Sequence, residues 1–112
     1  MNGMKKLIES IIKFRDDRNW NQFHNVKDLL LGLNIEVAEL QEIFLWSENV
    51  DSVDKQKIEG EVSDVFIFLV YICDHYKINF KDAIQKKLEV HKSHYPIDKS
   101  RNNTNKYNNL NG

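Results

Sequence analysis

Four acidic residues in this sequence form two pairs, and each pair is spaced by three residues. Glu36 and Glu39 make up the first pair, and Glu61 and Asp64 make up the second. Residues three apart in a helix project from the same side one turn along, so each pair can present two carboxylates together. Carboxylate oxygens are the ligands that Mg²⁺ and Mn²⁺ prefer, whereas Zn²⁺ favours nitrogen and sulfur. The spacing therefore indicates a site for Mg²⁺, or for Mn²⁺ as the alternative ion.

The neighbours of the acids place them toward a protein core. Glu36 lies three residues after Leu33 and four before Leu40. Glu61 has the same spacing from the apolar residues before and after it. An ionised carboxylate that faces a core is costly unless it is paired or coordinated, and clustered carboxylates also repel one another. A divalent cation would remove both costs.

Other interpretations also fit acidic pairs on helices. The acids could lie on solvated faces and form ion pairs with lysines, the candidates being Lys27, Lys57 and Lys87. A di-iron bundle is disfavoured, because it needs a Glu-x-x-His pair from each of two helices and the sequence has none. The metal site and the ion-paired surface both stay open on the residues alone.

Four helices are expected to position these acids. Apolar residues recur at helical spacing over residues 4–18, 25–46, 51–76 and 79–95. One proline and four glycines in the chain favour long helices over a sheet-rich fold. We predict an all-α domain over residues 1–98, a four-helix bundle whose second and third helices are antiparallel and meet at the acids.

The C-terminal residues differ from the rest of the chain in composition. Residues 99–112 are rich in asparagine, which predicts a disordered tail.

The composition of the whole chain excludes several classes of protein. A net charge of −1 gives no sign of binding to a nucleic-acid polymer. The longest apolar run, over 65–73, is too short to span a membrane, and we expect no signal peptide. The single cysteine, Cys73, suits a reducing compartment, so a cytoplasmic location is expected.

The apolar run over 65–73 also predicts an oligomer. It is apolar on every face, and a helix of this kind is buried all round. Three other helices in a chain of 112 residues can hardly enclose it, so a second subunit should pack against it. We predict a homodimer, or a homotetramer built from two dimers.

The segments around the acids resemble the MazG-like superfamily of all-α nucleoside triphosphate pyrophosphohydrolases. Glu36-Val-Ala-Glu39 and Glu61-Val-Ser-Asp64 are similar to its E-x-x-E and E-x-x-D signature. Three longer segments resemble its dCTP pyrophosphatase branch, namely residues 15–46, 61–71 and 87–96. This branch makes dimers or tetramers, in agreement with the oligomer expected from the apolar run.

The resemblance implies cleavage between the α and β phosphates of a nucleoside triphosphate, which yields a monophosphate and pyrophosphate. The four acids would hold one or more Mg²⁺ ions, which neutralise phosphate charge and activate water. Glu39, or Glu36 in its place, would orient or deprotonate the attacking water. Lys87 would offset the charge of the leaving pyrophosphate, with Lys92 or Arg15 as alternatives.

The same resemblance implies a set of substrate contacts. Trp20 and Trp46 match positions of the base pocket, where aromatic rings stack a base. Phe68 stands where a tyrosine is usual, and His91 where an asparagine is usual, so the exact substrate stays open. The substrate-binding residues expected are Trp20, His24, Trp46, Phe68, Lys87, His91 and Tyr95. Core packing of the aromatic rings, and a bond from the His24 side chain to local backbone, are the structural alternatives.

Three functions remain as hypotheses. The first is a pyrophosphohydrolase of a dCTP-like nucleotide, for sanitation or control of the nucleotide pool. The second is a non-catalytic helical regulatory or interaction module, which the retention of all four acids disfavours. The third is a related pyrophosphohydrolase acting on another nucleotide such as dUTP, which the aromatic residues flanking 25–46 disfavour.

Overall fold

The computed structural model describes residues 2–109, and every regular element in that range is helical. This confirms the all-α class. The α-helices are α1 (Asn2–Asp17), α2 (Val26–Glu42), α3 (Lys55–His75), α4 (Phe80–His94) and α5 (Ile97–Ser100). Three 3₁₀ turns connect or follow them, η1 (Trp20–Phe23), η2 (Val50–Ser52) and η3 (Tyr107–Asn109).

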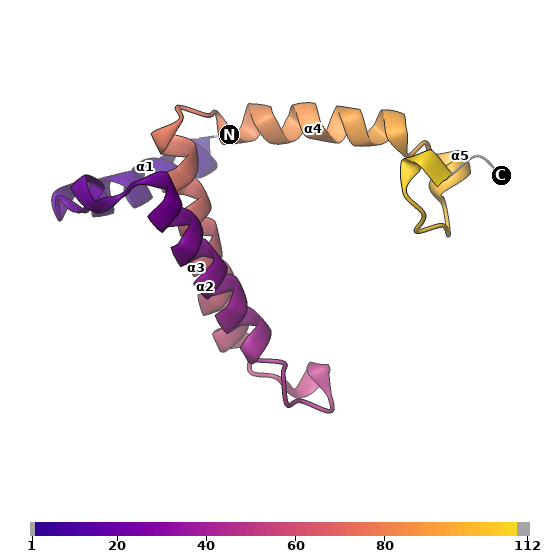
Figure 1. Ribbon diagram of the computed structural model, residues 1–112, viewed down its shortest axis with the longest axis horizontal. Helices are drawn as coiled ribbons and strands as arrows, with labels where there is room; N and C mark the ends of the chain where they lie inside the picture. Colours follow the sequence, from indigo (N-terminus) through magenta and orange to yellow (C-terminus); the bar gives the residue numbers. More distant parts are fainter. Residues whose placement is uncertain (1, 110–112) are drawn as a thin grey trace. The chain divides into compact units, whose positions relative to one another are not determined.

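The chain divides into two compact units, the first ending at Ile78 and the second beginning at Asn79. Three of the four long helices expected from the sequence, α1 to α3, belong to the first unit. The fourth, α4, belongs to the second unit together with α5. Within the first unit, α2 and α3 lie side by side and run in opposite directions (Figure 1).

Side-chain caps explain where the helices begin. The Asn25 side chain accepts a hydrogen bond from the backbone N–H of Asp28 at 2.9 Å, as expected for the start of α2. The Asn79 side chain caps α4 in the same way at 3.1 Å. The third helix begins later than the expected residue 51, because Asp51 and Ser52 belong to η2 and the Asp54 side chain caps the start of α3.

The end of α2 also differs from the expectation. The helix stops at Glu42 rather than near Trp46. The backbone N–H groups of Phe44 and Leu45 bond three residues back, to the carbonyls of Gln41 and Glu42, which is the tighter pattern of a terminal turn. Trp46 therefore follows the helix rather than forming part of it.

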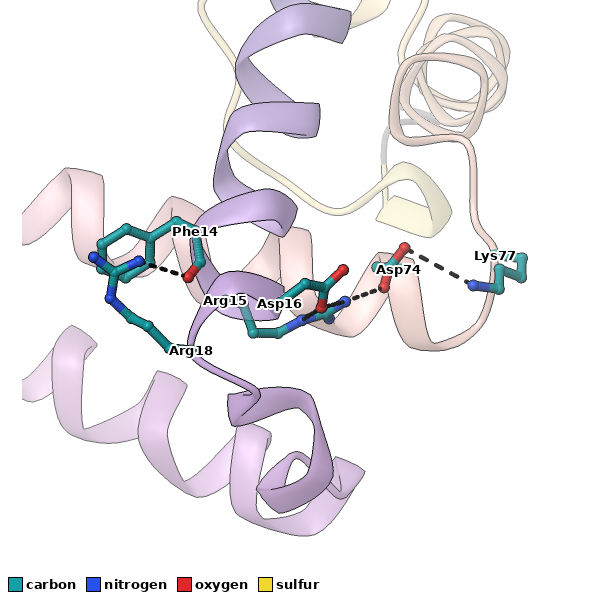
Figure 2. A network of polar contacts seen from close by, with 6 residues as sticks. All are labelled: Phe14, Arg15, Asp16, Arg18, Asp74 and Lys77. Atoms are coloured by element: carbon teal, nitrogen blue, oxygen red, sulfur yellow. Dashed lines mark hydrogen bonds and ion pairs between the residues drawn. The ribbon is translucent and has the colours of Figure 1, made fainter.

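A small core lies where the three helices of the first unit meet. Leu29 of α2 and Val70 of α3 are each 2% exposed, and Tyr71 of α3 is also buried. Arg15 of α1 is the buried charged residue at this joint. Its guanidinium bonds to Asp74 of α3 at 3.0 Å and to Asp16 at 2.9 Å (Figure 2).

The second unit contains α4 and a segment that folds at its end. The ring of Tyr107 stacks on His94 with centroids 4.0 Å apart and also meets Tyr95 edge-on. The tail predicted over 99–112 thus begins within α5 and includes η3, and residues 110–112 lie outside the described range. Among residues 2–109, no helix combines the length and the apolarity required to cross a membrane.

Candidate functional site

Three of the four predicted acids meet between α2 and α3. Glu36, Glu39 and Glu61 each place a carboxylate oxygen within 4.8 Å of the others, and we call these three residues the acidic cluster. Glu36 and Glu61 are half-buried, whereas Glu39 is exposed. Asp64 is exposed and is not a member of the cluster, although it lies close enough for its charge to act on Glu36 and Glu61.

Helical repeat and helix pairing together produce this cluster. Glu36 and Glu39 project from one side of α2 because they are three residues apart. Glu61 reaches them from α3, which the buried side chains of Leu29 and Val70 help to hold against α2. Each acid is therefore positioned by packing elsewhere on its own helix.

The surroundings favour the protonated form of two of these carboxyl groups. Burial raises the pKa of Glu36 to about 7, and the neighbouring Glu39 and Asp64 carboxylates add to the rise. Burial also raises the pKa of Glu61, with the charge of Glu39 as the next cause. Both shifts follow from crowding negative charge in a partly desolvated place.

Two oxygens of the cluster have no hydrogen-bond partner. Oε2 of Glu36 and Oε2 of Glu61 are buried and unpaired. A buried polar atom without a partner carries its full desolvation cost, so such an atom calls for an explanation. A small divalent cation with oxygen ligands would bond both atoms and offset the repulsion, so the residues present fit Mg²⁺ or Mn²⁺.

The alternative of ion pairs with lysines is not what the first unit shows. Within residues 2–78, Lys27 and Lys57 form no ion pair with the cluster. Arg15, one alternative for the phosphates, is engaged with Asp16 and Asp74 at the α1–α3 joint. The acidic cluster therefore gathers negative charge that its own unit does not neutralise.

The two tryptophans lie in different surroundings. Trp20 is 45% exposed and meets Phe14 edge-on, with ring centroids 5.7 Å apart. Trp46 is 90% exposed. Core packing was the structural alternative for these rings, and it does not describe Trp46 within a single chain.

His24 and Phe68 both pack against Tyr71. The ring of His24 lies 4.9 Å from that of Tyr71, and its Nδ1 is buried without a hydrogen-bond partner. Burial lowers the pKa of His24, and the charge of Arg15 lowers it further, so both favour the neutral ring. Phe68 meets Tyr71 edge-on at 6.2 Å and its ring also faces Gly32 of α2.

The remaining expected residues belong to the second unit. Lys87 and His91 are exposed on α4, and Tyr95 is half-buried just after it. A cavity of about 670 Å³ in this unit is lined by Lys92, Tyr95, Ile97, Asp98 and Arg101. Arg101 was not singled out in the sequence. Pro96 could have indicated it, because a proline after a helix predicts a change of direction. Pro96 precedes the short helix α5, after which Arg101 lines the same cavity as Tyr95.

Comparisons with known proteins agree with this geometry. The pattern that defines the MazG-like family matches residues 31–110. A mouse protein named dCTP pyrophosphatase 1 is 31% identical over 105 residues, which cover 88% of this chain and 62% of the mouse protein. The human dCTP pyrophosphatase 1 is 30% identical with the same coverage. The chain therefore spans about three fifths of the length of the curated relatives it matches.

A solved structure gives the same result for the fold. The crystal structure of a pyrophosphatase from Archaeoglobus fulgidus superposes with a TM-score of 0.76 at 37% sequence identity. The match covers 83% of this chain and 92% of the archaeal chain. With the family pattern matched over residues 31–110 and the acidic cluster inside that range, this chain belongs to the MazG-like family.

Proposed function

We propose that this chain is a nucleoside triphosphate pyrophosphohydrolase that requires Mg²⁺, or Mn²⁺ in its place. It would cleave the α–β phosphoanhydride bond of a dCTP-like nucleotide to give a monophosphate and pyrophosphate. The observation that carries the proposal is the acidic cluster, with two buried carboxylate oxygens that lack partners. The pyrophosphatases among its relatives support the same reaction.

The members of the cluster would divide the work according to their burial. Glu36 and Glu61, whose Oε2 atoms are buried and unpaired, are suited to hold the metal ion together with Glu39 and Asp64. The bound ion would supply positive charge beside the phosphate oxygens. Glu39 is exposed, so one of its oxygens remains accessible to orient the attacking water and accept its proton. Glu36 is the second candidate for this role.

The nucleotide would be held by residues outside the cluster. Exposed aromatic rings can stack a base, and Trp46 and Trp20 leave 90% and 45% of their surface open for this purpose. The unpaired Nδ1 of His24 would hydrogen-bond to the substrate. Phe68 would pack near the sugar. Lys87 and Tyr95 are the proposed contacts of the phosphates, and His91 is a further proposed contact of the nucleotide.

We also propose that the chain works as a homodimer or homotetramer. Large apolar side chains stay exposed at helical spacing, such as Leu31 (60%) and Ile35 (49%) on α2. On α4, Ile84 and Leu88 are 44% and 51% exposed with the same spacing. Apolar surface of this kind marks subunit contacts. Light scattering tests the proposal, and an active species near 13.3 kDa would contradict it.

Release of pyrophosphate from a panel of nucleoside triphosphates tests the activity. We expect turnover of dCTP with Mg²⁺, reduced turnover of the other nucleotides, and none in excess EDTA. Turnover of dUTP in preference to dCTP would favour the related enzyme with a different base specificity. No release from any nucleotide, with either Mg²⁺ or Mn²⁺, would favour the non-catalytic module.

A further inference from the structure

Gly32 of α2 leaves a gap that Phe68 of α3 occupies. A Cβ added at Gly32 would lie 2.6 Å from Cζ of Phe68 and 3.3 Å from Cδ1, and still closer to Cε1. Carbon atoms that are not bonded do not approach to 2.6 Å, because their optimal separation is about 3.5–4.0 Å. Any other residue at this position would therefore push the ring away or separate the two helices.

The other described glycines show no such contact. A Cβ added at Gly60 in α3, or at Gly3 in α1, would meet nothing within 4 Å. Glycine lowers the stability of a helix interior, so its presence there is informative when the missing side chain makes room for a neighbour. Among these glycines, Gly32 alone meets that condition.

The contact between Gly32 and Phe68 lies one helical turn from the acids on both helices. Glu36 follows Gly32 by four residues in α2, and Asp64 precedes Phe68 by four residues in α3. Because α2 and α3 are antiparallel, Glu36 and Asp64 lie in the same direction from this contact, each about one helical turn away. The Gly32–Phe68 contact therefore acts on the separation of α2 and α3 one turn away from the acidic cluster.

The separation of the helices matters for the size of the ion. Distances between packed helix axes depend on the side chains at the contact, and small residues allow the closest approach. Mg²⁺ requires oxygen ligands at about 2.0–2.1 Å in near-octahedral geometry, whereas Ca²⁺ accepts about 2.3–2.6 Å and irregular geometry. A wider gap between α2 and α3 would therefore impair Mg²⁺ binding more than Ca²⁺ binding.

We propose that Gly32 and Phe68 are positioning residues that fit the carboxylate site to the small Mg²⁺ ion. The ring of Phe68, seated in the gap at Gly32, sets how closely Glu36 and Glu39 approach Glu61. This inference rests on the proposed function, because it assumes that the acidic cluster binds a divalent cation. It adds a determinant of metal selectivity that lies outside the ligands themselves.

The test is Mg²⁺ and Ca²⁺ binding by the full chain, measured by titration calorimetry without nucleotide. Gly32→Ala should weaken Mg²⁺ binding about tenfold or more, a loss typical of residues that support metal ligands. It should weaken Ca²⁺ binding less, so the preference for Mg²⁺ over Ca²⁺ falls. The double variant Gly32→Ala/Phe68→Leu should recover the wild-type preference, because the smaller side chain relieves the clash.

Gly60→Ala is the matched control, because it makes the same substitution in a helix where the new methyl group meets nothing. It should leave both affinities unchanged. Wild-type affinities in Gly32→Ala would overturn the inference while the metal site and the proposed function stand. Failure of the wild-type chain to bind either ion would instead remove the metal site, and both proposals would fall.

The double variant also decides the case in which Gly32→Ala does not fold. A folded double variant with the wild-type ion preference would support the inference, since the clash between position 32 and the ring would then account for the damage. A double variant that does not fold, or that folds with an altered preference, would overturn it.

Discussion

Charged side chains enter a helix interface at two places in the first unit. At the α1–α3 joint, the buried Arg15 bonds to Asp16 and Asp74 at 2.9 and 3.0 Å (Figure 2). At the α2–α3 interface, the three glutamates of the acidic cluster gather with no basic side chain of residues 2–78 paired to them. One interface balances its charges internally, and the other collects charges of one sign.

The difference separates a structural use of buried charge from a functional one. Arg15 and Asp74 pair across the joint, so removing Arg15 would leave Asp74 with only the exposed Lys77, 3.9 Å away, and destabilise the fold. The acidic cluster leaves two buried oxygens unpaired, so it lowers the stability of the metal-free protein. Functional sites often lower the stability of a protein in this way while their ligand is absent.

The largest effect is expected from Glu61→Gln, which removes a charge from the cluster but keeps the size of the side chain. Turnover and Mg²⁺ affinity should fall together by at least about 10- to 100-fold, the loss seen when only a supporting residue of a metal site is changed. The metal-free variant should unfold at the same temperature as wild type or higher, because repulsion is reduced. Titration calorimetry, pyrophosphate release and thermal unfolding measure the three quantities.

Glu59→Gln is the control, since Glu59 lies on the same helix with 63% of its side chain exposed. It should retain both turnover and Mg²⁺ affinity. Full turnover in Glu61→Gln, or full turnover of wild type in excess EDTA, would reject the role of the cluster.

Arg15→Met should lower the stability of the fold, in contrast to Glu61→Gln, which should lower activity. The side chain of Arg15 is 9% exposed and that of Asp74 is 23% exposed, so Asp74 would be left partly buried with only the exposed Lys77, 3.9 Å away, as a counter-charge. The free energy of unfolding in urea should fall by about 3 kcal/mol. The double variant Arg15→Met/Asp74→Asn should recover part of this loss. An unchanged unfolding curve for Arg15→Met would show that the joint does not depend on the ion pair.

The pKa of Glu36 predicts a pH dependence of the metal-free protein. It is about 7 in the folded chain against an ordinary value of 4.5, so the folded chain keeps a proton that the unfolded chain loses between these values. The contribution of Glu36 to stability is thus fully present below pH 4.5 and is lost as the pH rises through about 7. In EDTA, the unfolding free energy of wild type should fall relative to Glu36→Gln over this window.

Metal binding should respond to pH in the opposite sense. Because Mg²⁺ competes with the proton on Glu36, its apparent affinity should rise as the pH passes through about 7. Urea unfolding and calorimetric titration across this range check the two trends. A constant difference between wild type and Glu36→Gln at every pH would contradict the raised pKa.

The smallest effect is expected at an exposed ion pair. Lys13 and Asp17 of α1 lie 2.7 Å apart, but their side chains are 73% and 54% exposed. Lys13→Ala should change the unfolding free energy by only about 0.3–0.5 kcal/mol, and 1 M salt should remove most of that difference. A loss as large as that of Arg15→Met would mean that burial does not explain the behaviour of the joint.

The residues whose roles the sequence predicted least well are those that contact a partner far along the chain. Arg15 was an alternative for binding phosphate, yet in the structure it is held by Asp74, 59 residues away. Phe68 was expected to contact the substrate in place of the usual tyrosine. In the structure its ring packs against Gly32 on another helix. Neither partner can be predicted from nearby residues, because the residue spacing within one helix does not determine which side chains of another helix pack against it.

Local chemistry was enough to predict that the helices form, although not where α2 ends or where α3 begins. The caps at Asn25 and Asn79, and the pairing of acids at a spacing of three, follow from bonds and repeats within a few residues. The helical spacing of apolar residues and the spacing of the acids are the features on which the all-α class and the acidic pairs were predicted. The start of α3 was missed because two neighbouring caps, Asn49 and Asp54, compete over a few residues, and the first opens only a 3₁₀ turn.

Tertiary packing decided which acids come together. The helical repeat determines that Glu61 and Asp64 share a side of α3, but not how far α3 is rotated or shifted against α2. That rotation puts Glu61 into the acidic cluster and leaves Asp64 exposed beside it. The sequence determined which residues each helix offers, because helix geometry is local, and the structure decided which of them meet, because packing between helices is not.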